Sequence, residues 1–344
     1  MSAHHESQPR PPQAVSRLGL YLPPALLLAG ALAWCGFWFY AARLTESGLA
    51  DMKADEAAHG RLWDCADQKI AGFPFRIELH CASVVLDATP DGRQARIRTG
   101  ALHAVTQIYA PTLRLADIDG PMVIEAEGTT TSAAWETMRI SVRFSSRLDR
   151  LSLVTANPQI EVQTATGEKL TSAAKSAEAH FRFDPARRVD DRAIDLAVQL
   201  TELNSPAVNA WIGTPEKVDF AIAGVATKLS DVPPQGWRNL LDAWRTAGGS
   251  FIVESGAFAK GALQLEAKGQ LNLDASHRLQ GKLDVSARGL GPIVARFGGG
   301  GMNQLIGPLL TRKDGTPVQW PVQLQEGRIQ MGPLRTGSIL SPLY

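Results

Sequence analysis

Residues 63–81 read WDCADQKIAGFPFRIELHC, and this stretch decides which kind of fold the chain can form. After the GFPF motif, apolar side chains alternate with charged or polar ones along RIELH. A period of two is typical of a β-strand that has one apolar and one polar face. Two of the three cysteines, Cys65 and Cys81, flank this strand. Whether these cysteines can form a disulfide depends on the cellular compartment of this segment, because disulfides persist in oxidising compartments.

The same alternation recurs along most of the remaining chain. Five further apolar runs of period two begin at Met138, Ile194, Val218, Leu263 and Leu279. Antiparallel sheets that are covered on one side require this pattern. The sequence predicts a mainly β protein, a β-rich α+β class, with long curved antiparallel sheets.

Two later stretches have helical rather than strand patterning, and we expect two short helical segments there. In residues 232–249, Trp237, Leu241 and Trp244 fall on one helical face, with Pro near the start and Gly after the end. Residues 291–310 are interrupted by four glycines at 298–301. These glycines indicate either two short helical turns or a flexible apolar loop.

Three segments share one plan, in which an apolar residue and Asp precede an Arg-containing turn and a second alternating strand. They are residues 86–102, 183–203 and 273–290. We predict three similar β-hairpins. They are either copies of a repeated unit or products of turn chemistry that any hairpin shares.

Residues 18–42 contain no charged residue. At about 1.5 Å per residue they exceed the hydrocarbon core of a bilayer, about 30 Å thick. Aromatic residues that include Trp34 and Trp38 crowd one end, where a cleaved signal peptide would have small residues. We therefore expect a transmembrane helix over residues 18–42. A disordered cytoplasmic tail (1–17) would precede it, and a helical stalk (43–62) and a β-rich domain (63–344) would follow.

Lys and Arg counts on the two sides of this helix do not decide its orientation. If residues 63–344 are exported, Cys65 and Cys81 can form a lasting disulfide, worth about 3 kcal/mol by constraint of the unfolded chain. In the cytosol they would be two buried thiols. We favour the first alternative, a single-pass inner-membrane protein with a periplasmic domain.

The composition and motifs exclude several classes of function. With 35 basic and 34 acidic residues the net charge is +1, which argues against a nucleic-acid binder. No histidine lies at zinc-ligand spacing from another His, Cys or carboxylate, and the glycines at 298–301 lack the Lys and Ser/Thr of a phosphate loop. The sequence predicts no catalytic residues, no metal, no cofactor and no enzyme. An envelope hydrolase with an unrecognised site is a distant third hypothesis.

An apolar sheet face held near a membrane favours a lipid-binding surface. The candidate groove residues are Ile194, Leu196, Phe220, Leu265 and Val285. The candidate lid is the helix with Trp237, Leu241 and Trp244, and the glycines at 298–301 are its candidate hinge. The alternative is an envelope scaffold with a filled core and no ligand, since apolar strand faces are usually core.

Three segments carry a resemblance to a known family: GFPFRIELHC (72–81), YAPTLRLADIDGP (109–121) and PVQLQEGRIQMGPLRTG (321–337). With the N-terminal anchor, they resemble the uncharacterised bacterial envelope family catalogued as domain of unknown function 2125. The resemblance covers nearly the whole chain after the tail and implies no activity. More loosely, the chain is similar to AsmA-like envelope proteins, a resemblance that implies long β-sheet grooves and a role in lipid homeostasis. The chain is short for that group.

Overall fold

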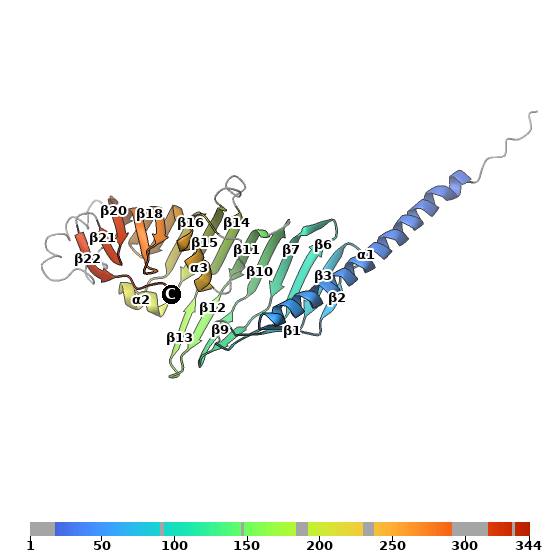
Figure 1. Ribbon diagram of the computed structural model, residues 1–344, viewed down its shortest axis with the longest axis horizontal. Helices are drawn as coiled ribbons and strands as arrows, with labels where there is room; N and C mark the ends of the chain where they lie inside the picture. Colours follow the sequence, from blue (N-terminus) through green and yellow to red (C-terminus); the bar gives the residue numbers. More distant parts are fainter. Residues whose placement is uncertain are drawn as a thin grey trace, which may run out of the picture.

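The structure is a computed structural model that describes residues 18–89, 93–145, 148–183, 192–229, 237–290, 316–331 and 334–344. Within these ranges, two antiparallel sheets of seven and fifteen strands run side by side, and a long helix leads into one end (Figure 1). The predicted β-rich class with long antiparallel sheets and an N-terminal apolar helix is confirmed.

The helices are α1 (Leu18–Ala58), α2 (Pro206–Ile212) and α3 (Trp237–Thr246). The small sheet contains, in spatial order, β1 (Arg61–Ala66), β4 (Ser83–Ala88), β5 (Ala95–Thr99), β8 (Met122–Ala126), β9 (Thr129–Ala134), β12 (Gln159–Gln163) and β13 (Lys169–Ala173). The large sheet begins with β2 (Lys69–Ala71), β3 (Arg76–Cys81), β6 (Leu102–Gln107), β7 (Ala110–Ile118), β10 (Thr137–Phe144), β11 (Leu148–Ala156), β14 (Ser176–Phe183) and β15 (Ile194–Leu203). It continues with β16 (Val218–Ala226), β17 (Phe251–Lys260), β18 (Leu263–Leu273), β19 (Leu279–Arg288), β20 (Val318–Gln325), β21 (Arg328–Met331) and β22 (Leu334–Ile339).

The first fourteen strands alternate between the two sheets. From β2 onward, two strands in the large sheet are followed by two in the small sheet, and the chain crosses between them through connections of one to three residues. Hydrogen bonds continue through these crossings, as from Ala82 N to Ala66 O at 2.8 Å. Asp67 and Asn157, which have left-handed φ values of 51° and 48°, make two of the bends. The two sheets are therefore joined along one line of strand ends, which we call the seam, and they diverge from it.

The helix α1 is continuous from Leu18 to Ala58, and it is long and apolar enough to cross a membrane. The predicted stalk to residue 62 is corrected: Gly60 adopts a left-handed φ of 74° that ends the helix, and Arg61 starts β1. The helix does not stand free of the domain either, because Trp38 and Ala42 pack on Ile77.

The short helix α2 was not predicted. Ser205 occupies its N-cap position, Pro206 its first turn, and Gly213, with a left-handed φ of 88°, its C-cap. Its Ile212 is buried with Leu263, Ala287 and Leu290 in one of the two described core clusters.

The predicted helix within residues 232–249 is confirmed as α3, whereas the predicted helical stretch at 291–310 lies outside the described residues. The three hairpin segments correspond to β4–β5, β14–β15 and β18–β19, each an antiparallel pair. The first lies in the small sheet and the other two in the large sheet, so they do not occupy equivalent positions.

Candidate functional site

One face of the large sheet carries an unbroken row of apolar residues. Thirteen strands of the large sheet, from β2 to β20 in spatial order, each place one residue directly opposite the next strand's residue in this row. They are Ile70, Leu79, Ala104, Ala116, Ile140, Leu153, Ala179, Val198, Ile222, Gly256, Ala267, Val285 and Trp320. No member of the row is charged, so an apolar strip runs across the sheet perpendicular to its strands.

The adjacent row, one residue along each strand, points to the opposite face and is mostly polar or charged. It contains Lys69, His80, His103, Asp117, Arg139, Val154, Glu178, Gln199, Ala221, Ala257, Glu266, Ser286 and Gln319. The contrast follows from the period of two in each strand. We call the apolar side the inner face and the polar side the outer face.

The small sheet has the same division. Its inner row is Trp63, Leu86, Ile97, Ile124, Thr131, Val162 and Leu170, and its outer row is Leu62, Asp87, Arg96, Glu125, Thr130, Gln163 and Lys169. In the outer row Arg96 makes two hydrogen bonds to Asp87, at 2.6 and 2.8 Å. The Arg96 hydrogen bonds hold the pKa of the Asp87 carboxyl below its ordinary value.

The two inner faces are turned toward each other. Cys81, on the inner face of β3, forms a disulfide with Cys65 of β1, and their Cα atoms are 5.2 Å apart. The predicted pairing is confirmed, and Cys81 is 3% exposed. The disulfide joins the two sheets across the seam. The helix α2 contacts β13 of the small sheet and also packs on Phe258, Leu265 and Trp320 of the large sheet's inner face.

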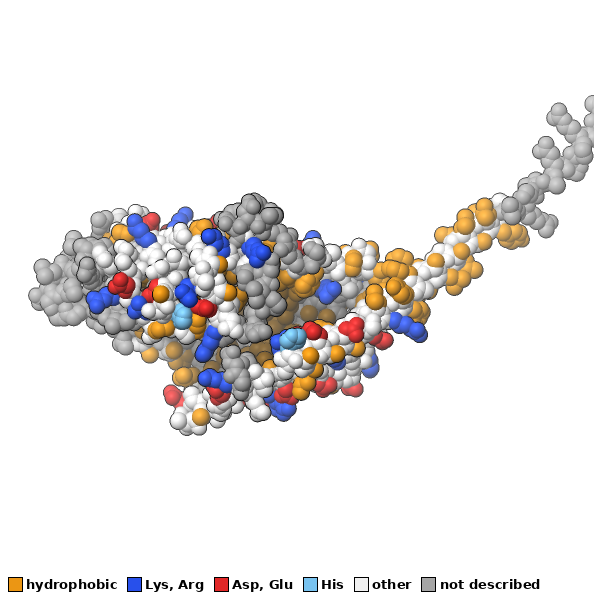
Figure 2. Space-filling view, viewed as in Figure 1, with side chains coloured by type: hydrophobic (Ala, Val, Ile, Leu, Met, Phe, Trp, Pro, Cys, Tyr) orange, Lys and Arg blue, Asp and Glu red, His pale blue; other side chains and the backbone are white. Residues whose placement is uncertain are grey.

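The space between the inner faces is an open groove with the seam as its floor. Two sheets that pack as a sandwich lie about 10 Å apart and bury their inner faces. Here, among the described residues between positions 82 and 192, Thr155 alone is buried. On the inner faces Val198 is 37% exposed, Leu170 is 42% and Ile160 is 44%. Figure 2 shows hydrophobic side chains in the hollow between the sheets.

At the first end of the groove, α1 passes from the large sheet to the small one. Trp34 and Trp38 donate hydrogen bonds of 2.8 Å to Pro74 O and Arg76 O, at the turn between β2 and β3. Residue 58 lies twenty residues further along, about 30 Å at the rise of an α-helix, and leads directly into β1. The helix therefore crosses the end of the groove from one sheet to the other (Figure 1).

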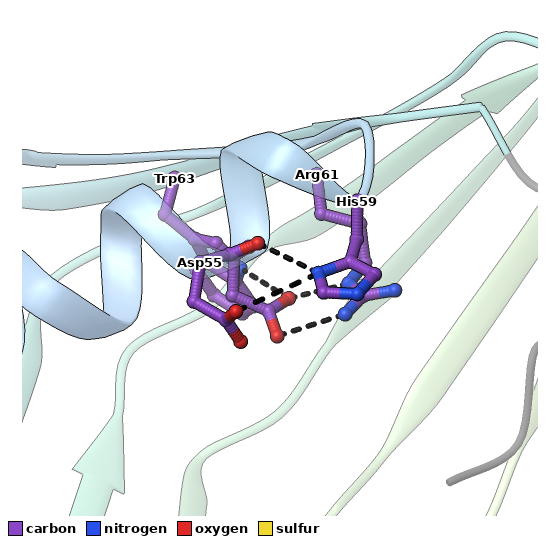
Figure 3. Close-up of polar contacts among 5 residues, drawn as sticks. Asp55, His59, Arg61 and Trp63 are labelled. Atoms are coloured by element: carbon purple, nitrogen blue, oxygen red, sulfur yellow. Dashed lines mark hydrogen bonds and ion pairs between the residues drawn. The ribbon is translucent and has the colours of Figure 1, made fainter.

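The junction of α1 with β1 is held by polar contacts (Figure 3). Arg61 donates two hydrogen bonds to the Glu56 carboxylate, one of them from Nη2 at 2.9 Å. Trp63 Nε1 donates a third hydrogen bond to it at 3.3 Å. The Arg61 hydrogen bond lowers the pKa of Glu56 to about 2. This carboxylate therefore fixes the last turn of α1 to the inner side of β1.

The five predicted groove residues all lie on the inner face of the large sheet, but their surroundings differ. Val285 belongs to the apolar row, and Phe220, Leu265, Leu196 and Ile194 lie one or more residue pairs away from it. Ile194 is 5% exposed. Leu265 packs against the α2 core cluster. The helix α2 thus covers part of the C-terminal region of the inner face.

The predicted lid helix is fixed at its C-terminal end. Trp244 is 8% exposed, and its Nε1 donates a hydrogen bond of 2.8 Å to Thr227 O, just after β16. Leu241 is partly buried, and the side chain of Trp237 lies outside the described part of the chain. The predicted hinge at 298–301 is also outside it.

A hollow of about 1090 Å³ lies elsewhere, along the hairpin ends of the small sheet. Its lining includes Asp87, Arg96 and Glu125 of the outer row, together with their alanine and threonine neighbours. Because Arg96 is paired with Asp87, and Arg98 with Glu125 at 2.5 Å, these charges already satisfy one another. We therefore place the candidate site in the apolar groove.

Comparison with curated proteins finds no match to this chain. A family described as "Uncharacterized protein conserved in bacteria (DUF2125)" matches residues 38–339, which include both sheets and α1 from Trp38 onward. The chain belongs to this family of uncharacterised bacterial proteins.

Proposed function

We propose that this chain is an inner-membrane-anchored envelope protein whose periplasmic domain binds lipid, or another elongated apolar ligand, in the groove between the two sheets. The observation that carries the proposal is the apolar row of the large sheet, which stays partly exposed opposite a second apolar face. Soluble surfaces rarely keep contiguous apolar areas of this kind unless they bind something.

The length of the row suits acyl chains. Twelve inter-strand steps of about 4.8 Å give about 58 Å. One leaflet of a bilayer core is about 15 Å thick, so the strip is several times the depth that one lipid chain occupies. Apart from Trp320, the side chains of the row are aliphatic or small, and the charged side chains of the adjacent row lie on the outer face. This arrangement favours a non-polar ligand without a requirement for one particular headgroup.

The position of the anchor supports the same proposal. The Trp34 and Trp38 contacts place the β2–β3 turn at the end of the apolar part of α1. The groove would therefore begin at the bilayer surface, where lipid is most concentrated. The disulfide supports export to the periplasm, since disulfides persist in oxidising compartments. The proposal assigns the domain no chemical reaction, and the likeness to AsmA-like proteins stays a prediction.

Site-specific photo-crosslinking in the full-length, membrane-embedded chain tests the proposal without interference from lipids around the anchor. A photoreactive phenylalanine analogue at Val198 or Ile160 points into the groove. Matched controls are Gln199 and Gln159, each adjacent on the same strand but on the outer face. We expect lipid adducts by mass spectrometry at Val198 and Ile160, and none at the controls.

Lipid adducts of equal yield at all four positions, or none at any of them, would overturn the proposal. Protein adducts confined to Val198 and Ile160 would replace it with the scaffold hypothesis, in which another protein fills the groove. Val198→Asp and Gln199→Asp give a second comparison. The first should lower the lipid that co-purifies with the chain and the second should not, while circular dichroism confirms that both variants are folded.

A further inference from the structure

Glu78, His80 and His103 form a cluster of potential metal ligands on the outer face, near the first edge of the large sheet. One ligand atom from each residue lies within 4.8 Å of the other two. His80 Nε2 is 3.1 Å from Glu78 Oε2, and His103 Nε2 is 3.5 Å from the same oxygen. Two imidazole nitrogens and one carboxylate oxygen therefore lie close enough together to be candidate ligands of one ion.

Strand geometry builds this arrangement. Glu78 and His80 are two residues apart on β3, so their side chains leave the same face. His103 stands directly opposite His80 on β6, and the two rings stack with centroids 4.3 Å apart. All three side chains are therefore held by regular hydrogen-bonded strands and not by a loop.

Two of the three ligand separations match those of a tetrahedral zinc site, and the two imidazole nitrogens lie within 4.8 Å of each other. Metal–ligand distances of about 2.0–2.1 Å correspond to ligand–ligand distances of about 3.3 Å along a tetrahedron edge. The observed distances of 3.1 and 3.5 Å lie on either side of that value. Three protein ligands leave one position of the tetrahedron for water.

Burial gives the second observation. Glu78 is 9% exposed. His103 Nε2 is a buried atom that makes no hydrogen bond and lies 3.5 Å from Glu78 Oε2, even though the rest of the ring reaches solvent. A buried nitrogen of this kind is costly unless something coordinates it.

Two cationic neighbours bear on the charge of the cluster. Arg76 Nε lies 2.5 Å from Glu78 Oε1, and Lys69 stands opposite His80 in register. The Arg76 side chain is 61% exposed and can turn toward solvent. It contacts Oε1, whereas both imidazoles face Oε2, so a metal ion on Oε2 leaves this pair in place.

We propose that Glu78, His80 and His103 bind one divalent transition-metal ion, with Zn²⁺ as the preferred ion. Mixed imidazole and carboxylate ligands suit Zn²⁺, whereas Ca²⁺ and Mg²⁺ require sets of oxygen ligands. The ion links β3 to β6 on the outer face, close to the disulfide that links β3 to β1 on the inner face.

The chain contains its own matched control. Glu178 and His180 on β14 form the same Glu-x-His pair, with His180 Nε2 3.3 Å from Glu178 Oε2. The residues directly opposite His180 on the two neighbouring strands are Ser152 and Ala197, and neither is a histidine. This pair therefore offers two ligands without a second histidine. Because the Glu178 side chain is 36% exposed and that of Glu78 is 11% exposed, the variant His103→Ala is needed to isolate the contribution of His103.

The test uses the full-length chain in detergent, with His4→Ala and His5→Ala so that the N-terminal histidines do not contribute. After removal of metal with a chelator, Zn²⁺ binding is measured by calorimetry, and the coordination geometry by the visible absorption of Co²⁺. We expect one Zn²⁺ per chain and a tetrahedral Co²⁺ spectrum. His103→Ala and His80→Ala should weaken binding by at least about tenfold, and His180→Ala should leave it unchanged.

Equal affinity in His103→Ala and the parent, or equal weakening in His180→Ala, would overturn the site. Absence of stoichiometric Zn²⁺ binding by the parent would overturn it as well. Thermal unfolding is the second readout: a ligand that binds the folded state raises the unfolding temperature. Zn²⁺ should raise it in the parent and in His180→Ala, but not in His103→Ala, and this comparison also shows that each variant folds.

Discussion

The indole Nε1 of Trp38 donates a hydrogen bond of 2.8 Å to the carbonyl oxygen of Arg76. It joins the apolar helix to the first residue of β3 across 38 positions in the sequence. Trp38 is 6% exposed and packs on Ile77, and its ring meets Phe73 edge to face at 5.4 Å. The helix is therefore part of the folded domain as well as the proposed membrane anchor.

Replacement of Trp38 by Phe should destabilise the domain. Phe keeps most of the packing but removes the donor, and it leaves the Arg76 carbonyl without this hydrogen bond, a loss of about 1–3 kcal/mol. Denaturant unfolding of the full chain, followed by circular dichroism, measures the free energy of unfolding. Tyr40→Phe is the control on the same helix, because Tyr40 is 65% exposed. Equal effects of the two substitutions would show that Trp38 does not dock the helix.

The turns beside Trp38 should lie at the depth of the lipid headgroups. Phe73 and Phe75 are 51% and 61% exposed, and Ile108 N donates to Phe75 O at 3.1 Å, which brings the exposed Tyr109 alongside. A nitroxide at Tyr109→Cys, in a Cys35→Ser background, should be reached by oxygen more readily than by a water-soluble relaxation agent.

Thr166 lies in the turn between β12 and β13, at the far end of the small sheet, and provides the comparison. A nitroxide at Thr166→Cys should show the accessibility of an aqueous site. If Tyr109→Cys gives the same accessibility in reconstituted membranes, the β6–β7 turn is remote from the bilayer, and the groove does not begin at its surface.

Reduction of the disulfide should destabilise the domain without unfolding α1. The cysteines are 16 residues apart, so the bond constrains the unfolded chain by about 3 kcal/mol. In the wild type, reductant should lower the unfolding midpoint. It should do the same in Cys35→Ser, in which the free cysteine is removed. The Cys65→Ser, Cys81→Ser double variant should have a low midpoint that reductant does not change. A midpoint of the wild type that is insensitive to reductant would contradict the pairing.

The junction of α1 with β1 should lose stability in acid. The pKa of Glu56 is lowered from 4.5 to about 2, chiefly by its hydrogen bond with Arg61. Because the folded state favours the carboxylate, its contribution is complete above the unfolded pKa and is lost as the pH falls from 4.5 toward 2.

Unfolding free energies of the wild type and Glu56→Gln, measured across this pH range, provide the check. Their difference should be constant near neutral pH and should shrink below pH 4.5. Arg61→Gln should remove the same pH-dependent part. A difference that does not change with pH would mean that Glu56 and Arg61 are not paired in solution.

Local sequence features were enough for several of these elements. The charge-free run that includes Trp34 and Trp38 predicted a membrane-length helix, and the alternation after Gly72 predicted β3. Periodicity and charge are properties of neighbouring residues, so they can be recognised without the fold. The flanking positions of Cys65 and Cys81 likewise predicted a bond that the structure contains.

The helix α2 was not predicted, because local periodicity does not reveal so short a helix. Its seven residues are too few for a helical period to stand out among the strands around it. The capping signals were present, since Ser205 and Pro206 precede it and Gly213 follows. These residue types are also those of turns, so they did not distinguish a short helix from a loop.

The residues of a strand that share a face can be recognised from the amino-acid order alone, because this depends only on the period of two. Which sheet a strand joins, and what stands opposite each residue, were decided by the tertiary structure. Strands of both sheets have the same pattern, and only the register across separate hairpins sets His103 opposite His80 and lines up the row that contains Val198. Whether that row is buried core or open groove depends on the angle between the sheets at the seam, which long-range packing decides and no local pattern encodes.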